Sequence, residues 1–478
     1  MLNSSFDAVV PMICLVVSGL ASMAAEAFRR KGEKMPIGGL GLVGLIAAGV
    51  STVILWNRNT TSFGVIAADN FGLFVTGILV VVGILTILFS GPVLDALDLP
   101  QGEYYTLLLF SISGMMMMAT ATDLLVVFVA LEILSLAVYV LTGIRRDDPK
   151  ATEAAFKYFL LGAFSSAFFL YGVALTYGLT GSTKLDRIGT FIAAQSMSDN
   201  PLILVAIGML LVGFAFKVSA VPFHMWTPDA YEGAPAIVTG FMSTGVKAAA
   251  FAAFARVFLA SFEPFSASWA PVLWVLAVAT MVVGTVVGVA QTNLKRMLAY
   301  SSIAHGGYLL VGLIAANQVG KAAILFYLLA YAVTNLAAFG VIALLGAKDK
   351  ANDELRDFAG LWQSHPALAA LMTISLLSLG GLPPTAGFIG KWYIFSAAVS
   401  AGYYGLAIIG MLTSVISVFF YMRVVVMMYM KDREGSAPNP ITGIGFAALT
   451  LAIIAILVLG IVPAPVLSLA AQSISTIF

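Results

Sequence analysis

Four ionisable side chains lie deep within long apolar stretches of this 478-residue sequence: Glu132, Lys217, Lys247 and Lys391. A charge at the centre of a lipid bilayer costs about 2.5–3.5 kcal/mol on insertion scales, so such residues face protein or water. Carboxylates and amines in that setting can hold and release protons, and most of them mark an ion or substrate path. We interpret these four as candidates for proton transfer. The alternative is a set of structural ion pairs between helices.

Depth alone selects three of the four residues. Glu132 lies near the middle of the apolar run 123–143, and it is the only acidic residue that we place at mid-depth. Lys247 lies near the centre of the run 234–259. Lys391 lies deep within the run 366–400, after a Gly/Pro break, whereas the depth of Lys217 depends on a break in its helix.

Lys217 is central only if its helix is interrupted. The apolar run Leu202–Phe216 is too short to span a bilayer comfortably, and Pro222 follows it closely. A helix that breaks around 218–222 places Lys217 near the midplane, beside freed backbone carbonyls. If the helix instead continued to Val221, the lysine could extend its ammonium to the cytoplasmic surface. We favour the break.

A second break is better marked. Gly380, Gly381, Pro383 and Pro384 cannot all lie in one continuous helix, and Lys391 follows them in the sequence. The two interrupted helices are five spans apart, and each carries a lysine beside the break. This pattern is typical of inverted repeats that hold their sites at the breaks.

Three further residues are secondary candidates. Lys157 follows Glu153 by four positions, so a surface ion pair would explain it without any role in transport. His305 and His224 could relay protons, because imidazole titrates near neutral pH. A hydrogen-bonded interior histidine explains each of them equally well.

The composition places these residues in a membrane protein. The chain is 60% hydrophobic and 10% charged, whereas a soluble domain carries about 25% charged residues. A formal net charge of +1 argues against nucleic acid or a strongly charged soluble partner. One cysteine, Cys14, and three histidines allow no disulfide framework and no iron–sulfur ligation, and they make a metal or haem centre unexpected. We therefore expect no redox cofactor in this chain.

Apolar runs long enough to span a bilayer recur about fourteen times. We predict an all-α polytopic membrane protein in which spans four to eight and nine to thirteen form two inverted five-helix repeats, with spans seven and twelve broken. The expected parts are a three-helix segment 1–103, a first repeat 104–260, a second repeat 261–430 and a C-terminal helix 431–478. The predicted runs are 8–27, 36–56, 70–90, 104–120, 123–143, 153–179, 201–229, 234–259, 269–291, 297–316, 321–346, 366–400, 404–429 and 442–463.

Basic residues predict the orientation of these spans. The first apolar run has Asp7 before it and four basic residues after it, which indicates a retained helix rather than a cleaved signal peptide. With the N-terminus outside, fourteen loop and helix-end basic residues face the cytoplasm and five face outward, a strong positive-inside bias. Fourteen spans also return the C-terminus to the outside. The cytoplasmic set is Arg29, Arg30, Lys31, Lys34, Arg145, Arg146, Lys150, Lys295, Arg296, Lys348, Lys350, Arg356, Lys431 and Arg433; the outer set is Arg58, Lys184, Arg187, Arg256 and Lys321.

Two long motifs resemble the antiporter-like proton-translocating subunits of respiratory complex I. They are Lys217-Val-Ser-Ala-Val-Pro-Phe-His-Met-Trp-Thr-Pro-Asp-Ala-Tyr-Glu-Gly-Ala-Pro235 and Asn293-Leu-Lys-Arg-Met-Leu-Ala-Tyr-Ser-Ser-Ile-Ala-His-Gly-Gly-Tyr308. The end of the first motif and the stretch Ala163–Tyr177 resemble the N type, and Lys391 matches the N pattern where the M type has a glutamate. The resemblance covers essentially the whole chain. One departure is Gly306-Gly307, where a bulkier second residue is commoner; looser packing beside His305 is the expected consequence.

The resemblance implies a role for each candidate. Glu132 and Lys217 would form a charge pair, Lys247 would be the central relay, and Lys391 would donate the proton on the exit side. Lys157 would assist uptake, and His305 would bridge between the lysines. Burial lowers the pKa of a lysine and a neighbouring carboxylate raises it, so relative movement of such a pair can switch a lysine between holding and releasing its proton.

The resemblance also implies the setting of this chain. It would be a non-redox subunit of an NADH:quinone oxidoreductase in the bacterial inner membrane, with both termini on the periplasmic side. NADH, FMN, iron–sulfur clusters and quinone would belong to partner subunits. Its neighbours would include the antiporter-like M subunit and small K-type and J-type subunits, within the lipid bilayer and without nucleic acid. Alternatives are a subunit of a multisubunit cation/proton antiporter, a stand-alone transporter, a quinone-binding subunit, or a scaffold whose lysines only pair structurally.

Overall fold

The computed structural model describes residues 6–29, 36–194, 200–346, 353–432 and 443–477, and nearly all of them are helical. Basic residues 30, 31, 34, 348, 350 and 433, and the first residue of the predicted run 442–463, lie outside this described part. The α-helices are α1 (Val10–Phe28), α2 (Ile37–Leu55), α3 (Asn70–Leu97), α4 (Gln101–Thr120), α5 (Leu124–Thr142), α6 (Pro149–Thr180), α7 (Leu185–Ala194), α8 (Pro201–Lys217), α9 (Trp226–Gly233), α10 (Ala236–Phe241), α11 (Lys247–Arg256), α12 (Ser266–Val289), α13 (Leu294–Ala315), α14 (Gln318–Leu345), α15 (Leu361–Ser364), α16 (Pro366–Gly380), α17 (Ala386–Ser400), α18 (Tyr404–Met430), α19 (Gly443–Ile461) and α20 (Ala464–Ile474).

Short elements complete the chain. The 3-10 turns are Asp7–Val9, Glu263–Phe265 and Leu355–Phe358, and the π-helical turns are Met242–Val246 and Val257–Ser261. Strands β1 (Thr60–Ser62) and β2 (Ile66–Ala68) pair antiparallel, with Thr60 opposite Ala68.

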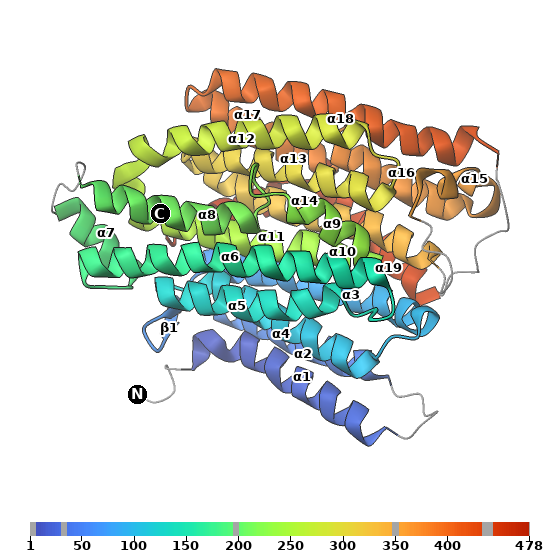
Figure 1. Ribbon diagram of the computed structural model, residues 1–478, viewed down its shortest axis with the longest axis horizontal. Coiled ribbons are helices and arrows are strands. Elements are labelled where there is room, and N and C mark those ends of the chain that lie inside the picture. Colours follow the sequence, from blue (N-terminus) through green and yellow to red (C-terminus); the bar gives the residue numbers. More distant parts are fainter. Residues whose placement is uncertain (1–5, 30–35, 195–199, 347–352, 433–442, 478) are drawn as a thin grey trace.

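The long helices lie side by side along the longest axis of the molecule, and the marks for the two chain ends fall at the same end as β1 and α7 (Figure 1). Within the described residues, eleven helices are long and apolar enough to cross a membrane. Each predicted apolar run coincides with one helix or with a pair of successive helices, which confirms the polytopic all-α prediction. The inverted relation of the two repeats and the domain boundaries stay predictions.

Three of the described helices, α7, α15 and α20, were not predicted. In α7, Leu185, Ile188 and Ile192 are buried, and their spacing places them on one side of a ten-residue helix. A helix this short has no apolar run of spanning length, so a search for such runs does not detect it.

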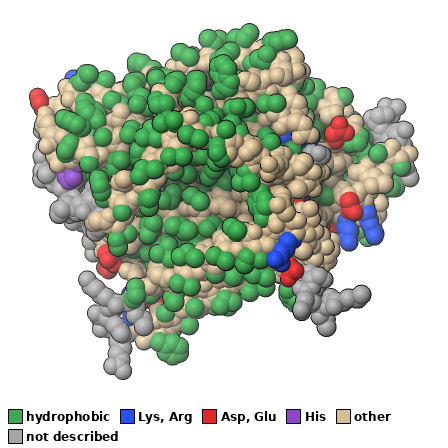
Figure 2. Space-filling view, turned by 180° about the vertical axis from the view of Figure 1, so that it is seen from behind, with side chains coloured by type: hydrophobic (Ala, Val, Ile, Leu, Met, Phe, Trp, Pro, Cys, Tyr) green, Lys and Arg blue, Asp and Glu red, His purple; other side chains and the backbone are tan. Residues whose placement is uncertain are grey.

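The outer surface is apolar between charged ends. Figure 2 shows hydrophobic side chains spread over the middle of one face, with charged side chains toward the margins. On α5 the exposed side chains include Leu125, Val129, Leu136 and Val140, which recur at helical spacing. This is the face that a spanning helix presents to lipid or to a neighbouring apolar helix.

Both predicted helix breaks are present. α8 ends at Lys217 and α9 begins at Trp226, while α16 ends at Gly380 and α17 begins at Ala386. Gly381 has φ +80°, a left-handed conformation that favours glycine and stops the helix. The breaks therefore follow from the local sequence.

The centre of the bundle is formed by three nearly enclosed segments: Ala236–Ser261, which includes α10 and α11, then α13 and α14. The buried polar residues of this centre include Lys247 and His305. The peripheral helices α1, α2, α6 and α12 are much less enclosed. The fold thus places the candidate relay residues in its core and away from lipid.

Candidate proton-transfer site

Lys247 is the first residue of α11 and follows directly after the π-helical turn 242–246. Its side chain is buried, and Nζ donates hydrogen bonds to the carbonyl of Ser302 at 2.5 Å and to Ser302 Oγ at 2.6 Å. The ring of Tyr331 lies 5.5 Å from Nζ. Within the described chain no ion pair involves Lys247, so neutral groups hold its ammonium. No ion pair among the described residues accounts for the burial of Lys247, and its role in proton transfer stays a prediction.

Lys391 is held at the second break. Its Nζ donates to the carbonyls of Leu379 at 2.8 Å and Gly380 at 3.0 Å, which are freed where α16 ends, and to Ser414 Oγ at 2.8 Å. A Cβ on Gly381 would lie 2.8 Å from Lys391 Cδ, so the glycine leaves room for the lysine side chain. The C-terminal end of α16 also provides partial negative charge for an ammonium.

Lys217 has a different environment from the one expected. It is buried at the end of α8, and Nζ has no hydrogen-bond partner among the described residues. The rings of Tyr139 and Tyr158 lie 5.5 and 5.6 Å from it. The expected contact with freed carbonyls is therefore absent from the described part of the chain.

At the first break, the backbone carbonyl of Phe216 accepts hydrogen bonds from groups other than Lys217. Phe216 O accepts hydrogen bonds from Ser219 N and, at 3.1 Å, from Trp226 Nε1. Local donors thus satisfy a carbonyl beside Lys217, whereas at the second break the lysine itself is the donor.

Glu132 lies on α5 and is partly buried. One of its carboxylate oxygens, Oε1, is buried without a hydrogen-bond partner, and no ion pair within 4 Å joins it to Lys217 among the described residues. The proposed charge pair therefore stays a prediction, and direct contact is not a feature of this conformation.

His305 joins three helices. Its Nδ1 is 2.6 Å from Tyr327 Oη on α14, and its Nε2 is 3.4 Å from Tyr421 Oη on α18. Tyr421 Oη also lies 2.5 Å from Ser301 Oγ on α13. Both ring nitrogens have partners, as expected of an interior histidine. Such two-sided bonding is also the geometry that passes a proton from one hydroxyl to the next.

The sequence alone did not reveal a polar stripe on α14. Tyr327, Tyr331, Thr334 and Asn335 are all buried, and they contact His305, Lys247, Ser378 and Ser243 respectively. Their spacing of four, three and one residues keeps them on one side of the helix. That spacing is visible in the sequence, but none of these residues carries a charge, so a search for buried charges does not find them.

The glycine pair beside His305 is tightly packed. A Cβ on Gly306 would lie 2.8 Å from the carbonyl of Val218, and a Cβ on Gly307 would lie 2.5 Å from Met281 Cγ. The expectation of loose packing was wrong. The missing side chains let α13 approach both the first helix break and α12.

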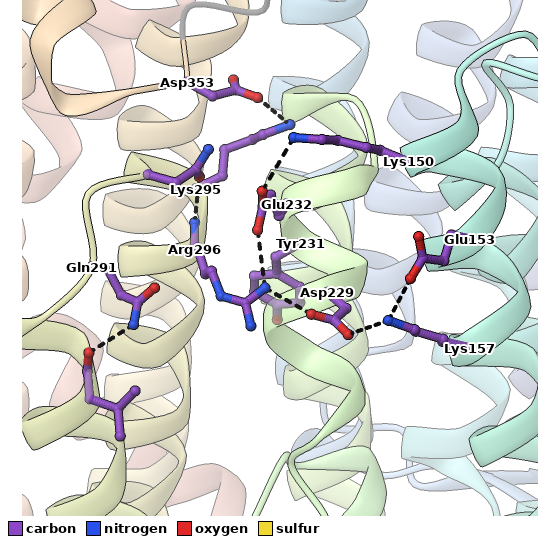
Figure 3. Close-up of polar contacts among 12 residues, drawn as sticks. Lys150, Glu153, Lys157, Asp229, Tyr231, Glu232, Gln291, Lys295, Arg296 and Asp353 are labelled. Atoms are coloured by element: carbon purple, nitrogen blue, oxygen red, sulfur yellow. Dashed lines mark hydrogen bonds and ion pairs between the residues drawn. The ribbon is translucent and has the colours of Figure 1, made fainter.

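Lys157 belongs to a charged cluster at one end of the bundle (Figure 3). Its Nζ lies 2.7 Å from Glu153 and 3.0 Å from Asp229, and Arg296 bonds to Asp229 at 2.8 Å and to Glu232 at 3.0 Å. The expected i,i+4 pair with Glu153 is thus present. Burial raises the pKa of Asp229, but hydrogen bonds from Arg296 and Lys157 outweigh it and hold that pKa below its usual value.

A second ion pair lies in the same region. Lys295 and Asp353 approach to 2.8 Å, and Lys295 also donates to the carbonyl of Ala234. Burial raises the pKa of Asp353 in spite of this lysine. The clustered ion pairs fix α9 between α6 and α13.

An aromatic stack separates the charged cluster from Lys217. Tyr158, the neighbour of Lys157 in the sequence, stacks on Trp226 at 4.1 Å with the ring planes 3° apart. His224 lies in the turn before Trp226, and its Nδ1 is buried without a hydrogen-bond partner among the described residues. The structure does not bring His224 into contact with the candidate lysines. In the described residues, no group of three or more His, Cys, Asp or Glu side chains is arranged to hold a metal ion.

Residues 121–417 match the family described as NADH:quinone oxidoreductase/Mrp antiporter, transmembrane (TM), and the chain belongs to this family. It is 44% identical over 475 residues to NADH-quinone oxidoreductase subunit N of Trichlorobacter lovleyi, covering 99% of this chain and 98% of that protein. It is 43% identical over 470 residues to subunit N of Chloroflexus aggregans, covering 97% and 96%.

Solved structures agree with this assignment. A chain of respiratory complex I from Thermus thermophilus with bound aureothin matches with a TM-score of 0.82 and 36% identity, covering 96% of this chain and 99% of that one. A chain of the Mrp complex from Dietzia matches with a TM-score of 0.83 and 21% identity, covering 100% and 98%. The second match shows a common fold.

Proposed function

We propose that this chain is a proton-translocating membrane subunit of an NADH:quinone oxidoreductase, of the N type. The observation that carries the proposal is the bonding of Lys247 and Lys391. Each ammonium is buried, each is held by hydroxyls and backbone carbonyls, and neither has a carboxylate partner among the described residues. Groups of this kind can give up a proton without leaving a buried carboxylate unpaired.

The proposed path begins at the charged cluster and ends at the second break. Protons would be collected near Lys157 and Asp229, pass the Tyr158–Trp226 stack and reach Lys217, whose proton affinity Glu132 would adjust. Lys247 would receive the proton and pass it through Ser302 and the hydroxyls around His305. Lys391 would release it on the exit side. His224, beside the first break, remains a secondary candidate for this uptake step.

The energy for this movement would come from partner subunits. Moving one charge against the membrane potential requires about 2.3 kcal/mol per 100 mV. NADH, FMN, iron–sulfur clusters and quinone would be held by partners, and their redox reaction would bias the conformation of this chain. The neighbours proposed are the M-type, K-type and J-type membrane subunits.

The proposed location is the bacterial inner membrane with both termini on the periplasmic side. Basic residues support this orientation, because Arg145, Lys150 and Arg296 belong to the end that carries the charged cluster. The chain ends are marked at the opposite end of the bundle, with β1 (Figure 1). The division into segments 1–103, 104–260, 261–430 and 431–478 is part of the same proposal.

The alternative is a subunit of a multisubunit cation/proton antiporter. The match to the Mrp complex has 21% identity, whereas the relatives at 40–44% identity are named NADH-quinone oxidoreductase subunit N. This difference favours the oxidoreductase.

The test compares proton pumping with electron transfer in the assembled complex. Lys217→Ala, Lys247→Ala and Lys391→Ala should each lower the number of protons pumped per NADH oxidised while the complex still assembles. Lys184→Ala, outside the spans, is the matched lysine control and should pump normally. Normal stoichiometry in all three assembled variants would falsify the proposal, and sodium flux driven by the isolated chain would favour the antiporter.

A further inference from the structure

Asn335 is an uncharged residue at the centre of the bundle. The amide nitrogen of its side chain has a hydrogen-bond partner, but the amide oxygen has none among the described residues. Asn335 is fully buried on α14, and its Nδ2 donates to Ser243 Oγ at 2.7 Å. Its Oδ1 is buried without any partner in the described residues. A buried amide oxygen left without a hydrogen bond destabilises the fold, so the contact that fixes this orientation must compensate for that loss.

The bonding of Ser243 fixes which end of the amide faces it. Ser243 Oγ donates its single proton to the carbonyl of Gly240 at 2.9 Å. The same oxygen can then only accept from Asn335, so the NH₂ group must face Ser243. The hydrogen bonds of Ser243 therefore determine the orientation of the Asn335 amide, and the atom left without a partner is the acceptor Oδ1.

Ser243 belongs to the π-helical turn 242–246, which ends immediately before Lys247. A π turn contains an extra residue relative to an α turn, so its loss would rotate Lys247 by about 100° relative to α10. Thr244 Oγ1 also donates to the carbonyl of Gly240, at 2.8 Å. Ser243 and Thr244 thus both donate to the carbonyl of Gly240, which lies on α10 just before the turn. The hydrogen bond from Asn335 is different because it comes from another helix, α14.

α14 contacts the lysine itself as well. The Tyr331 ring lies 5.5 Å from Lys247 Nζ, one helical turn before Asn335. Thr334, the neighbour of Asn335 in the polar stripe, bonds to Ser378 at 3.0 Å beside the second break. α14 therefore contacts both the turn that orients Lys247 and the helix break that holds Lys391.

We propose that Asn335 is a positioning residue for proton transfer: through Ser243 it maintains the π-helical turn that directs Lys247 toward Ser302. This inference rests on the proposed function, because it assigns Asn335 a role only if Lys247 relays protons. Asn335 would not carry the proton itself.

The experiment measures protons pumped per NADH oxidised in the assembled complex for Asn335→Leu, Ser243→Ala, the double variant, and Lys247→Ala as reference. Each single variant should lose at least half as much pumping as Lys247→Ala. The double variant should lose no more than the worse single variant, because both changes remove the same contact. Thr86→Val is the control: Thr86 is equally buried, and its hydroxyl donates to the carbonyl of Val82 within α3.

Asn335→Asp provides a readout that a packing role would not change. A protonated aspartate can donate to Ser243 as the amide does, whereas an ionised one cannot. Pumping relative to the unaltered complex should therefore be near normal at low pH and fall as pH rises, while Asn335→Leu should show no such pH dependence. If Asn335→Leu fails to assemble, Ser243→Ala and Asn335→Asp still decide the question.

The outcomes separate the two proposals. Normal pumping by Lys247→Ala overturns the relay role of Lys247 and with it this inference, whereas the proposed function is overturned only if Lys217→Ala and Lys391→Ala also pump normally. A large loss in Lys247→Ala with normal pumping in Ser243→Ala overturns the role of Asn335 alone. If the losses of proton pumping in the two single variants multiply in the double variant, the two residues act independently, which contradicts positioning through Ser243. Pumping by Asn335→Asp that does not change with pH contradicts it as well.

Discussion

Lys247 and Ser302 form a two-point contact: the lysine ammonium donates to both the carbonyl and the hydroxyl of the same serine, at 2.5 and 2.6 Å. The contact joins α11 to α13 in the most enclosed part of the bundle. It also connects the central lysine to the helix that carries His305. A charged residue whose partners are all neutral can lose its proton without disrupting an ion pair.

Ser302→Ala should remove one of these two bonds and leave the other. A hydrogen bond to a charged group contributes about 1.5–3 kcal/mol, so we expect a clear but incomplete loss of proton pumping, smaller than in Lys247→Ala. The pumping of each variant is measured as proton uptake by membrane vesicles during NADH oxidation. Ser111→Ala is the control, because Ser111 is equally buried on α4 and its hydroxyl donates to the carbonyl of Leu134 on α5 rather than contacting a lysine. Equal pumping by Ser302→Ala and the unaltered complex would contradict this role.

Gly381→Ala should destabilise the second break. The residue has φ +80°, where an alanine costs about 1–2 kcal/mol, and the new Cβ would lie 2.8 Å from Lys391 Cδ. We expect the unfolding free energy of the full chain in detergent to fall by about 2 kcal/mol or more. Gly178→Ala is the matched control, since Gly178 lies on α6 and a Cβ added there would meet no atom of the described residues within 4 Å. A chain with Gly381→Ala as stable as this control would show that the break tolerates a side chain.

Arg256→Met should be strongly destabilising. Arg256 bonds to both carboxylate oxygens of Asp69, at 2.7 and 2.9 Å, and the pair is buried. Removing one partner of a buried pair costs about 3–5 kcal/mol, because the other charge is left uncompensated. Thermal unfolding of the full chain should show this loss. Arg256→Met combined with Asp69→Asn should recover much of it, since asparagine keeps an acceptor for the bond from Gly72 N; no recovery would mean that the charge is not the cause.

Asp229→Asn should weaken the charged cluster modestly. The Asp229 side chain is 31% exposed, so losing its pairs with Lys157 and Arg296 should cost about 1 kcal/mol at most. The pKa of Asp229 is lowered in the fold, so its contribution is present above the ordinary aspartate pKa of about 3.9 and is lost as pH falls through the lower, folded value. The difference in unfolding temperature between the variant and the unaltered chain should be constant from pH 7 to about 4 and shrink below that. Glu153→Gln, whose side chain is 64% exposed, should change stability less.

Most of the fold could be predicted from the sequence, because the bilayer imposes a simple rule. Every spanning segment must satisfy its own backbone hydrogen bonds and face lipid or other helices, so spans appear as long apolar runs. The same rule marked Lys247 and Lys391 as unusual, and the glycines and prolines from Gly380 to Pro384 indicated a break. Helix α7 was not predicted because a short amphipathic helix has no such run.

Only the tertiary structure decided what each buried charge contacts. Lys391 bonds to the carbonyls of its break, whereas Lys217 does not; at the first break Ser219 N and Trp226 Nε1 donate to the carbonyl of Phe216. The polar stripe that contains Asn335 is visible in the sequence only as a spacing, since uncharged polar residues are common in spanning helices and their role depends on their partners. Charge and hydropathy are properties of single residues and are readable in order along the chain. Hydrogen-bond partners far apart in the sequence, such as Lys247 with Ser302 and Asn335 with Ser243, are set by how the helices pack.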